Sequence, residues 1–519
     1  MGILKKNISP RRKQLREAIA ADRFAKLVNF VNSGLLLEGA MLLVFAAACS
    51  FLFSINLSHS LISYRPVHQI VAMVIFVLIL CGACGLYIYR FNFRLLKSPV
   101  RSAAIVSLFL VLLTLTKLSL LFRGSSYLAV AIAVGGAIIL AIVYEQRFAL
   151  AMSFTYSMLA CMAAGREWDF SLFLTMITGT IASSFLLREV RTRVKILEVG
   201  IFAGGAVFLM SFAMDLFAQG WNRKIFAEAG WAATGVVCVA VIIQAFLPII
   251  ERVFRIATSM TLLDYSDANQ PLLKKLAMDA PGTYSHSLLI GSIAEAAAES
   301  IGANGLLCRV GAYYHDIGKI GKPKYFVENQ MGSASRHDQL SPAMSQLIIS
   351  GHIRDGLDLA QEYGLPSVIR QFIETHHGTT LIEYFYEEAR KKANGDIPPA
   401  ESEFRYSGPR PQTKEAAIVM LADSIEGAVR AQTEVTPTKI ETIVHNMAMK
   451  RLQDGQFDEC ELTLKELSKI EETLSKSLAA HYHGRVAYPT VGGKPHHRTA
   501  TEEQEQEELE EHQQETENA

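Results

Sequence analysis

Charged residues are scarce in this sequence. Asp, Glu, Lys and Arg make up 19% of its 519 residues, whereas soluble proteins of this size carry about 25%. The mean hydropathy is positive, at +0.23. The shortage of charge lies between residues 34 and 250, where long apolar runs follow one another. A single soluble domain is therefore excluded, and we expect a membrane-embedded half followed by a soluble half.

Cysteine is also sparse and irregularly placed. The seven cysteines are odd in number and scattered in spacing, which argues against a disulfide framework. Cys81 and Cys84 form a C-x-x-C motif inside an apolar run. There we interpret them as small packing residues of a membrane helix rather than as a redox pair.

The apolar region predicts a bundle of about eight membrane-spanning helices, since each span needs about 20 mostly apolar residues. The candidate spans cover roughly 34–56, 68–89, 102–122, 127–144, 148–164, 170–187, 197–217 and 230–250. Glu38, Lys117 and Asp215 each lie near the end of a span, where long side chains can reach the interface. No span carries a buried acidic pair, which disfavours a transporter and favours an anchor or a sensor.

Lys and Arg are distributed unevenly between the two sides of the predicted bundle. The leader, residues 1–33, is basic, and so are the loops near residues 90–101 and 188–195. By the positive-inside rule, we expect a multi-pass protein of the cell membrane with its amino terminus in the cytoplasm. Eight spans over residues 34–250 return the chain to that side, so the soluble domain, residues 251–491, is expected there too. The acidic tail, residues 492–519, has too few apolar residues to form a core and is interpreted as disordered.

The soluble domain lacks any alternating strand pattern, so we expect it to be all-α. It concentrates the histidines, since only two of the fourteen precede residue 286. His315 and Asp316 close an apolar helical stretch, and His286 lies on the predicted helix before it. Imidazoles and carboxylates suit transition metals such as Fe, Mn or Zn. Two divalent ions fit this set better than one: His286, His315, Asp316, His352, His376, His377 and Asp423.

The order of these residues resembles that of the HD metal-dependent phosphohydrolases. Four phrases narrow the resemblance to the seven-transmembrane HD family of membrane cyclic di-AMP phosphodiesterases: Ala280-Pro281-Gly282-Thr283-Tyr284, His315-Asp316-Ile317-Gly318-Lys319, Asp454-Gly455-Gln456-Phe457-Asp458 and Tyr482-His483-Gly484-Arg485. The resemblance implies a cyclic dinucleotide as substrate, opened to a linear product. It implies no nucleic acid polymer as partner, and it leaves a homodimer open.

The resemblance also implies roles for single residues. One metal would be held by His286, His315, Asp316 and Asp423, and the other by Asp316, His352, His376 and His377. Lys319 would place a positive charge near the phosphate. Tyr284 and His337 are candidate substrate contacts, and helix capping is an equal alternative for the His337-Asp338 pair. The ligand set does not choose between manganese and iron.

Two departures from the family pattern stand out. Relatives carry a large extracellular domain after the first span, whereas only residues 57–67 fill that gap here, so we expect no external ligand-binding domain. Ser285 occupies a position where many relatives have a second histidine.

Two rival functions are disfavoured. A cyclic di-GMP hydrolase of the HD-GYP type would carry Gly-Tyr-Pro after the paired histidines, but Gly378-Thr-Thr-Leu follows here. A non-catalytic cyclic-dinucleotide receptor that signals through the bundle would tolerate loss of metal ligands, but the set is intact.

Overall fold

The computed structural model describes residues 35–483, apart from residues 59–60, 93–94, 96–98, 120–124, 145, 164–168, 188–189, 191, 255, 331–334, 394–398 and 433–434. The predicted basic leader and acidic tail lie outside these residues. Within them the predicted all-α class is confirmed, with one short β-hairpin added.

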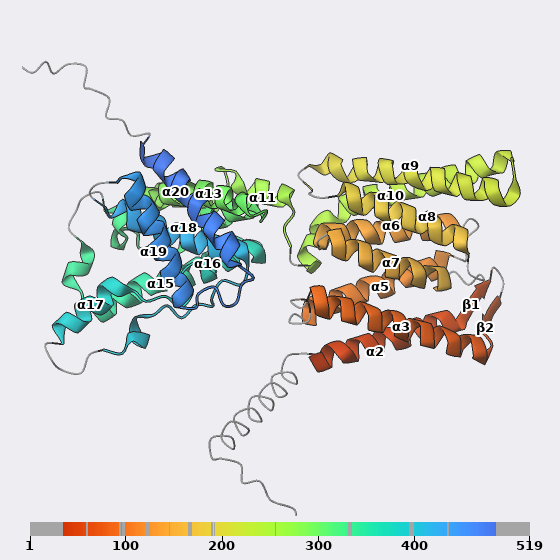
Figure 1. Cartoon of the computed structure of the whole chain (residues 1–519), viewed down its shortest axis with the longest axis horizontal. Coiled ribbons are helices and arrows are strands. Elements are labelled where there is room, and N and C mark those ends of the chain that lie inside the picture. The colour runs from red at the N-terminus through yellow and green to blue at the C-terminus, as the bar shows by residue number, and fades with distance from the viewer. Residues whose placement is uncertain are drawn as a thin grey trace, which may run out of the picture.

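Among the described residues of the amino-terminal half there are eight long helices, drawn red to yellow in Figure 1, and each coincides with one of the candidate spans. They are α2 (Leu35–Ser54), α3 (Val67–Phe91), α5 (Pro99–Ser119), α6 (Ser125–Val143), α7 (Gln146–Ala163), α8 (Phe170–Leu186), α9 (Arg193–Gln219) and α10 (Arg223–Phe254). Strands β1 (Ile55–Ser58) and β2 (Leu61–Tyr64) pair antiparallel between α2 and α3, with Ile55 opposite Tyr64.

Five of these helices, α2, α3, α5, α9 and α10, are long and apolar enough to cross a membrane. The apolar parts of α6 and α8 are shorter, at Tyr127–Val143 and Phe170–Leu186. That all eight cross the bilayer remains a prediction.

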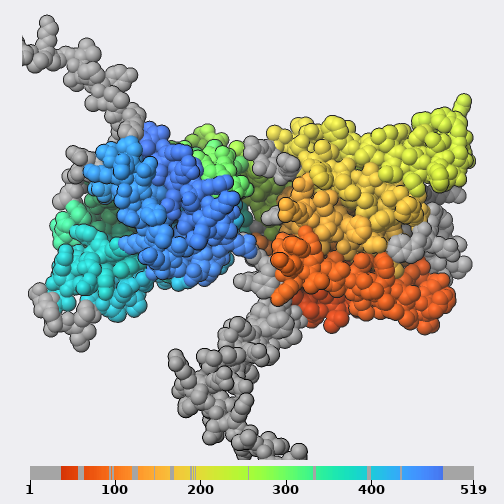
Figure 2. Space-filling model, in the orientation of Figure 1, coloured from red at the N-terminus to blue at the C-terminus, as the bar shows by residue number. Residues whose placement is uncertain are grey.

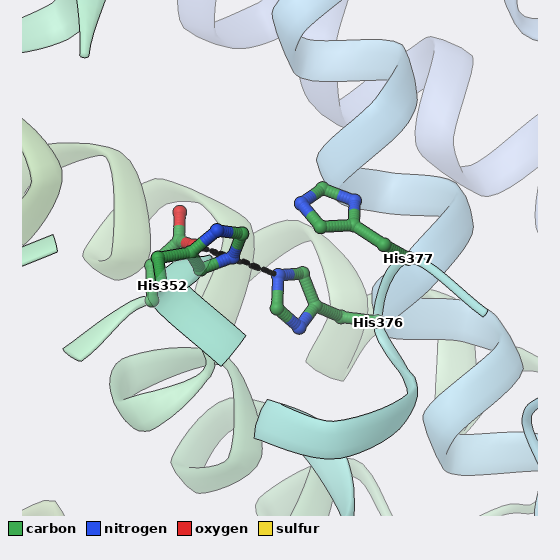
Figure 3. A group of neighbouring side chains, drawn as sticks. His352, His376 and His377 are labelled. Carbon is green, nitrogen blue, oxygen red and sulfur yellow. Dashed lines mark hydrogen bonds and ion pairs between the residues drawn. The ribbon is translucent and has the colours of Figure 1, made fainter. Parts of the chain in front are cut away.

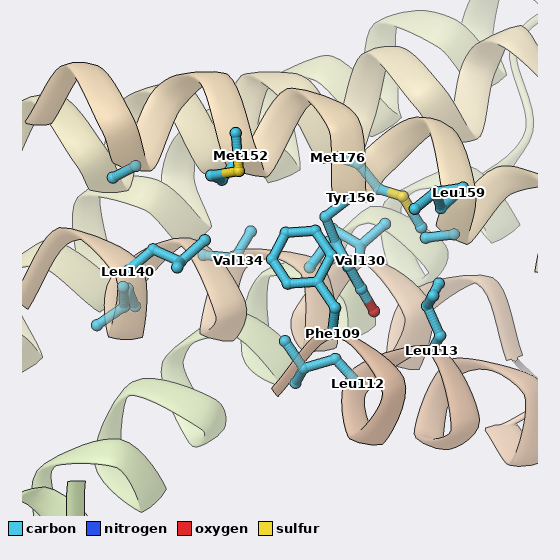
Figure 4. Close-up of a cluster of buried hydrophobic side chains, with 14 of the residues drawn as sticks. Phe109, Leu112, Leu113, Val130, Val134, Leu140, Met152, Tyr156, Leu159 and Met176 are labelled. Atoms are coloured by element: carbon cyan, nitrogen blue, oxygen red, sulfur yellow. The ribbon is translucent and has the colours of Figure 1, made fainter. Parts of the chain in front are cut away.

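The core of the bundle lies where α5, α6, α7 and α8 meet. Phe109, Val134, Tyr156 and Met176 are buried there and point toward one another (Figure 4). Small residues let the helices approach closely, since a Cβ atom on Gly179 would lie 2.5 Å from Val134 and 2.6 Å from Val207. Lipid tails are as apolar as the side chains, so close packing of this kind holds membrane helices together.

Several polar side chains inside the bundle form hydrogen bonds with nearby backbone carbonyl oxygens. The hydroxyls of Ser157 and Thr175 donate to carbonyl oxygens one turn earlier, at 2.8 Å each. Lys117 is buried, and its Nζ donates to the carbonyl oxygen of Ala163 at 3.0 Å. These bonds satisfy the groups without water, as the membrane interior requires.

The carboxyl-terminal half, green to blue in Figure 1, is a compact set of shorter helices. They are α11 (Ser259–Ser266), α12 (Pro271–Asp279), α13 (Pro281–Ser300), α14 (Gly305–Tyr314), η1 (Ile317–Gly321), η2 (Pro323–Tyr325), η3 (Val327–Asn329), η4 (Arg336–Gln339), α15 (Pro342–Glu362), α16 (Ser367–Thr375), α17 (Glu383–Lys392), η5 (Glu401–Phe404), α18 (Lys414–Arg430), α19 (Pro437–Gln453) and α20 (Leu464–His483). Figure 2 shows the two halves as separate bodies joined by a narrower region.

Two apolar clusters stabilise this domain. One gathers buried side chains of α13, α18, α19 and α20, such as Ile425 and Leu474. The other gathers those of α11, α12, α14 and α16, such as Leu276 and Tyr314. His315 and Asp316 follow α14 and directly adjoin the second cluster. Asp423 lies on α18, whose apolar side chains belong to the first cluster. The predicted ligands therefore lie where the two clusters meet.

A short connection joins the two halves. The Glu251 carboxylate, near the end of α10, accepts hydrogen bonds from the Thr258 amide at 2.7 Å and from the Thr261 hydroxyl at 2.9 Å. The Tyr314 hydroxyl donates to the carbonyl oxygen of Tyr265 at 2.9 Å. The end of the last bundle helix and the residue before His315 are thus both tied to α11.

Candidate metal centre

The turn that carries His315 and Asp316 depends on a glycine. Helix α14 ends at Tyr314, and Ile317 begins η1, with both side chains fully buried. A Cβ atom on Gly318 would overlap the backbone carbonyl oxygen of His352. Only glycine therefore lets η1 lie directly on α15, and this contact brings His315, Asp316 and His352 together.

The structure gathers the seven predicted ligands into two overlapping groups. In each group one ligand atom per residue lies within 4.8 Å of all the others. The groups are His286, His315, Asp316 and Asp423, and Asp316, His352, His376 and His377. They match the two ligand sets expected from the sequence, and Asp316 belongs to both.

The two carboxylate oxygens of Asp316 face different groups. Its Oδ2 lies 3.2 Å from His315 Nε2, on the side of the first group. Its Oδ1 lies 3.4 Å from His352 Nε2 and 3.5 Å from His376 Nε2, on the side of the second. Ligand atoms of one metal ion lie roughly 3.0–3.5 Å apart when each metal bond is about 2.1 Å long. The carboxylate is thus oriented to serve one ion on each side.

Backbone carbonyl oxygens fix the ring orientation of three histidines. Nδ1 of His315 lies 2.6 Å from Ala312 O, Nδ1 of His376 lies 2.9 Å from Ile373 O, and Nδ1 of His352 contacts Ile349 O. A carbonyl oxygen can only accept, so each Nδ1 donates, and Nε2 is the nitrogen that can bind a metal when it carries no proton. The Nε2 atoms of His352 and His376 point toward each other, 3.1 Å apart (Figure 3). Such fixed imidazoles are typical of metal ligands.

His286 is oriented by a carboxylate instead. Its Nδ1 lies 2.7 Å from Glu426 Oε2, and its Nε2 lies 3.0 Å from Asp423 Oδ1. Glu426 is buried, and it follows Asp423 by three residues on α18, so both side chains lie on one helix face. Glu426 was missed from the sequence, although its spacing from Asp423 could have revealed it.

Lys319 lies at the edge of the centre. Its Nζ is 2.6 Å from Asp316 Oδ2 and 2.9 Å from Glu328 Oε1, and its side chain is only 12% exposed. Glu328 also accepts a hydrogen bond from the Thr283 hydroxyl at 3.0 Å. Glu328 was missed from the sequence, because a single acidic residue in a helix as short as η3 has no distinctive pattern.

The electrostatics of the two groups differ. Burial lowers the pKa of His352 to about 4, although Asp316 opposes the shift, and burial also lowers the pKa of His377. Burial lowers the pKa of His315 too, but the carboxylates of Asp316 and Asp423 outweigh it and raise the pKa to about 10. Burial thus keeps the imidazoles of His352 and His377 neutral, whereas the carboxylates of the first group favour a positive charge beside them, either a proton on His315 or a metal cation in its place.

The residues fit divalent metal ions on direct structural grounds. His315 Nε2 and Asp316 Oδ1 are buried and accept no hydrogen bond from the described residues. Buried polar atoms normally have partners, and leaving one without costs about 1–3 kcal/mol. Here the orphaned atoms converge with other imidazoles and a carboxylate, so a cation at this position would satisfy them together.

Tyr406 covers one side of the centre. Its ring stacks on His377 with the centroids 4.2 Å apart and the planes 18° apart. Gln456 is fully buried behind this region, and its side-chain oxygen accepts from the Thr379 amide at 3.0 Å. Tyr406 was not predicted, because it lies outside any helix and carries no periodic signal.

The two candidate substrate contacts lie away from the ligand atoms. His337 Nε2 lies 2.9 Å from the carbonyl oxygen of Tyr325, and its ring packs on Phe385. Helix α15 is capped by Ser341, which accepts from the Met344 amide, so the capping alternative for His337-Asp338 is wrong. Tyr284 packs partly buried against the apolar cluster around Leu276. Neither residue contacts a predicted ligand among the interactions of the described residues, so their substrate roles remain predictions.

Comparison with known proteins gives two family matches that follow each other along the chain. Residues 67–258 match the family described as a 7TM receptor with an intracellular HD hydrolase. Residues 283–428 match the HD domain. The second match covers all seven predicted ligands.

Two curated relatives are similar over most of this chain. The cyclic-di-AMP phosphodiesterase PgpH of Bacillus subtilis is 37% identical over 371 residues, which are 69% of this chain and 51% of the relative. PgpH of Listeria monocytogenes is 33% identical over 440 residues, 84% of this chain and 61% of the relative. The chain thus spans between half and three fifths of the length of these relatives.

A solved structure matches the carboxyl-terminal half. The HD domain of the Listeria monocytogenes phosphodiesterase PgpH, in complex with cyclic-di-AMP, is 49% identical to this chain. The match covers 42% of this chain and 100% of that domain, with a TM-score of 0.40.

Proposed function

Because the chain belongs to the family of 7TM receptors with an intracellular HD hydrolase, we propose that its carboxyl-terminal half hydrolyses cyclic di-AMP to the linear diadenylate. The observation that carries this proposal is the Asp316 carboxylate, which directs one oxygen to each of two histidine groups. Two divalent ions held close together would stabilise the attacking and leaving oxygens of an in-line phosphoester displacement, and Asp316 would give one oxygen to each. The names of the two curated relatives supply the nucleotide.

Seven residues would hold the metal ions. His286, His315, Asp316 and Asp423 would bind one, and Asp316, His352, His376 and His377 the other. When bound, two such ions would offset negative charge on phosphoryl oxygens and lower the pKa of water, so that hydroxide would be available as the nucleophile near neutral pH. We propose manganese or iron, because both accept a mixed shell of imidazole and carboxylate.

Lys319 would bind the phosphate as a fixed cation. Burial lowers the pKa of its amine, but the carboxylates of Asp316 and Glu328 outweigh that effect and raise the pKa above its ordinary value. The amine therefore stays charged at neutral pH. It is held at the rim of the ligand groups, where it can stabilise charge that develops during attack.

The proposed orientation places this half in the cytoplasm. Family membership makes the chain a membrane protein. The side is inferred from Lys and Arg, which are frequent in the leader and in the loops near residues 90–101 and 188–195. Cyclic dinucleotides act inside the cell, so a cytoplasmic site would meet its substrate.

The test uses the full chain in detergent, stripped of metal with a chelator and reloaded with Mn²⁺ or Fe²⁺. Cyclic di-AMP and cyclic di-GMP are incubated in parallel, and the products are separated by chromatography. We expect preferential opening of cyclic di-AMP to the linear diadenylate, restored by metal and absent from the stripped protein. Tight nucleotide binding without turnover under either metal would instead identify a receptor. Preferential opening of cyclic di-GMP would overturn the choice of nucleotide.

A further inference from the structure

A pocket opens into the amino-terminal bundle between α2, α3, α5 and α7. The space inside the pocket and at its open mouth together is about 750 Å³. Most of its lining is apolar. The last of the helices that form it, α7, ends at Ala163, far before the first predicted ligand, His286, and these helices contribute no residue to the two ligand groups.

The inner part of the pocket suits a hydrocarbon chain. Phe45 and Phe109 line it and meet edge to face, with ring centroids 6.2 Å apart. Met152 and Leu159 of α7 line the same pocket. Cys84 lies in the wall with its Sγ 3.2 Å from the Thr155 hydroxyl. These surfaces offer dispersion contacts and little competing hydrogen bonding.

One end of the pocket carries a buried acceptor. Glu38 lines the pocket and is only 7% exposed, and its Oε1 has no hydrogen-bond partner among the described residues. Ser102 also lines this end, and its hydroxyl is within hydrogen-bonding reach of both the carbonyl oxygen of Leu95, at 3.1 Å, and the Glu38 carboxylate. That one hydroxyl hydrogen can serve only one acceptor at a time, and Oε1 of Glu38 has no partner among the described residues. A donor supplied by a ligand would satisfy the carboxylate oxygen.

The acceptor lies at a defined end of the bundle. Glu38 is in the first turn of α2, Ile88 in the last turn of α3 and Ser102 in the first turn of α5. These helix ends lie on the side of the bundle that faces the carboxyl-terminal half (Figure 1). A molecule with its head group at Glu38 would extend its chain from that end toward Phe45 and Phe109.

We propose that this pocket binds a single-chain lipophilic molecule whose head group donates a hydrogen bond or carries a positive charge. The apolar lining recognises the chain, and Glu38 recognises the head. A fatty acid anion is disfavoured, because its carboxylate would lie beside that of Glu38. The site is separate from the metal centre, so this inference stands whether or not the proposed hydrolysis does.

The experiment uses the full chain in phosphatidylcholine nanodiscs. Two probes share one photoreactive, alkyne-tagged eighteen-carbon chain and differ only in the head, a primary amine or a carboxylic acid. After illumination, the cross-linked peptides are mapped by mass spectrometry. We expect the amine to label peptides of α2, α3, α5 and α7 about tenfold more than the acid does, because only the amine can donate a charged hydrogen bond to Glu38. Equal labelling by both probes would mean that only bulk lipid fills the pocket, which overturns the proposal.

Variants separate the head-group contact from general lipid binding. Glu38→Leu should bring amine labelling down to the level of the acid, and Glu38→Gln should reduce it while keeping an acceptor. Glu198→Gln is the matched control, because that carboxylate lies on α9, is 44% exposed and pairs with Lys195 at 3.1 Å. It should leave labelling unchanged.

Should Glu38→Leu fail to fold, a second variant tests the pocket itself. Val106→Trp, which fills the pocket from α5, should block both probes. Unchanged amine labelling in Glu38→Leu or in Val106→Trp contradicts the assignment.

Discussion

The two halves of the molecule bury polar groups in opposite ways. In the bundle, hydroxyls such as that of Ser157 bond within their own helix, at 2.8 Å from a carbonyl oxygen one turn away. In the carboxyl-terminal half, His315 Nε2 and Asp316 Oδ1 are buried without hydrogen-bond partners and face other ligand atoms. Groups satisfied locally allow a helix to exist in an apolar environment, whereas unsatisfied groups that converge create a binding site. The bundle also holds isolated buried atoms without hydrogen-bond partners among the described residues, the hydroxyls of Tyr144, Ser153 and Ser184 and Oε1 of Glu38. Of these residues, Glu38 lines the pocket for which we infer a ligand.

The largest expected effect comes from removing the residue shared by both ligand groups. Asp316→Ala should lower cyclic di-AMP hydrolysis by roughly 10³-fold or more, since two ions would lose a common ligand. Bound metal, measured by mass spectrometry on desalted protein, should fall for both sites. The circular dichroism spectrum should keep its helical shape.

Asp338→Ala is the matched control for that variant. Asp338 belongs to the second His-Asp pair and is exposed, so its removal should leave turnover unchanged. Full activity in Asp316→Ala would refute the two-metal arrangement.

The next effect concerns the close approach of η1 to α15. Gly318→Ala would force a Cβ atom onto the carbonyl oxygen of His352, so the two backbones must separate. We expect a loss of about 3–5 kcal/mol in the free energy of unfolding, as for other severe steric changes, together with weaker metal binding. Thermal denaturation of the purified protein measures the first quantity.

Gly427→Ala provides the contrast for Gly318→Ala. Gly427 lies inside α18, and a Cβ atom there would meet nothing within 4 Å. Alanine favours a helix over glycine by about 1 kcal/mol, so this variant should be as stable as the parent or slightly more so. Equal melting temperatures for both variants would show that the contact at Gly318 is not tight.

A moderate effect on metal affinity is expected from changing Glu426, which supports the ligand His286. Glu426→Gln keeps the size of the side chain but removes the charge that holds His286 Nδ1 at 2.7 Å. Such supporting residues typically contribute 10–100-fold to metal affinity or activity. Metal titrations of the stripped protein should show a weakened site and an unchanged fold. Affinity identical to that of the parent would mean that His286 is oriented without Glu426.

The smallest effect tests the bundle side of the comparison. Ser157→Ala removes a hydroxyl that only bonds within its own helix. The expected change in stability is within about 1 kcal/mol, and hydrolysis should be unaffected. A large loss of folded protein in detergent would show that Ser157 has a role beyond its own helix.

Much of this arrangement could be predicted from the sequence, for a physical reason. Long apolar runs predicted the eight helices of the bundle, and the two ligand groups found in the structure consist of the residues expected. Histidine and aspartate can be recognised in a sequence as metal-binding residue types, whatever their positions in space. A single sequence does not show how each helix is rotated about its axis or how closely two helices pack. The support of His286 by Glu426 and the contact at Gly318 were therefore missed. Tyr406 was missed because an irregular segment has no period.

The position of Asp316 has a thermodynamic consequence. One carboxylate faces both ligand groups, with His315 3.2 Å from one oxygen and His352 3.4 Å from the other. An ion bound on one side fixes the carboxylate and withdraws its charge, which changes the affinity on the other side. Linkage requires that this influence be equal in both directions. The two ions would therefore load as a coupled pair, and the concentration of free metal in the cell would regulate the centre as a unit.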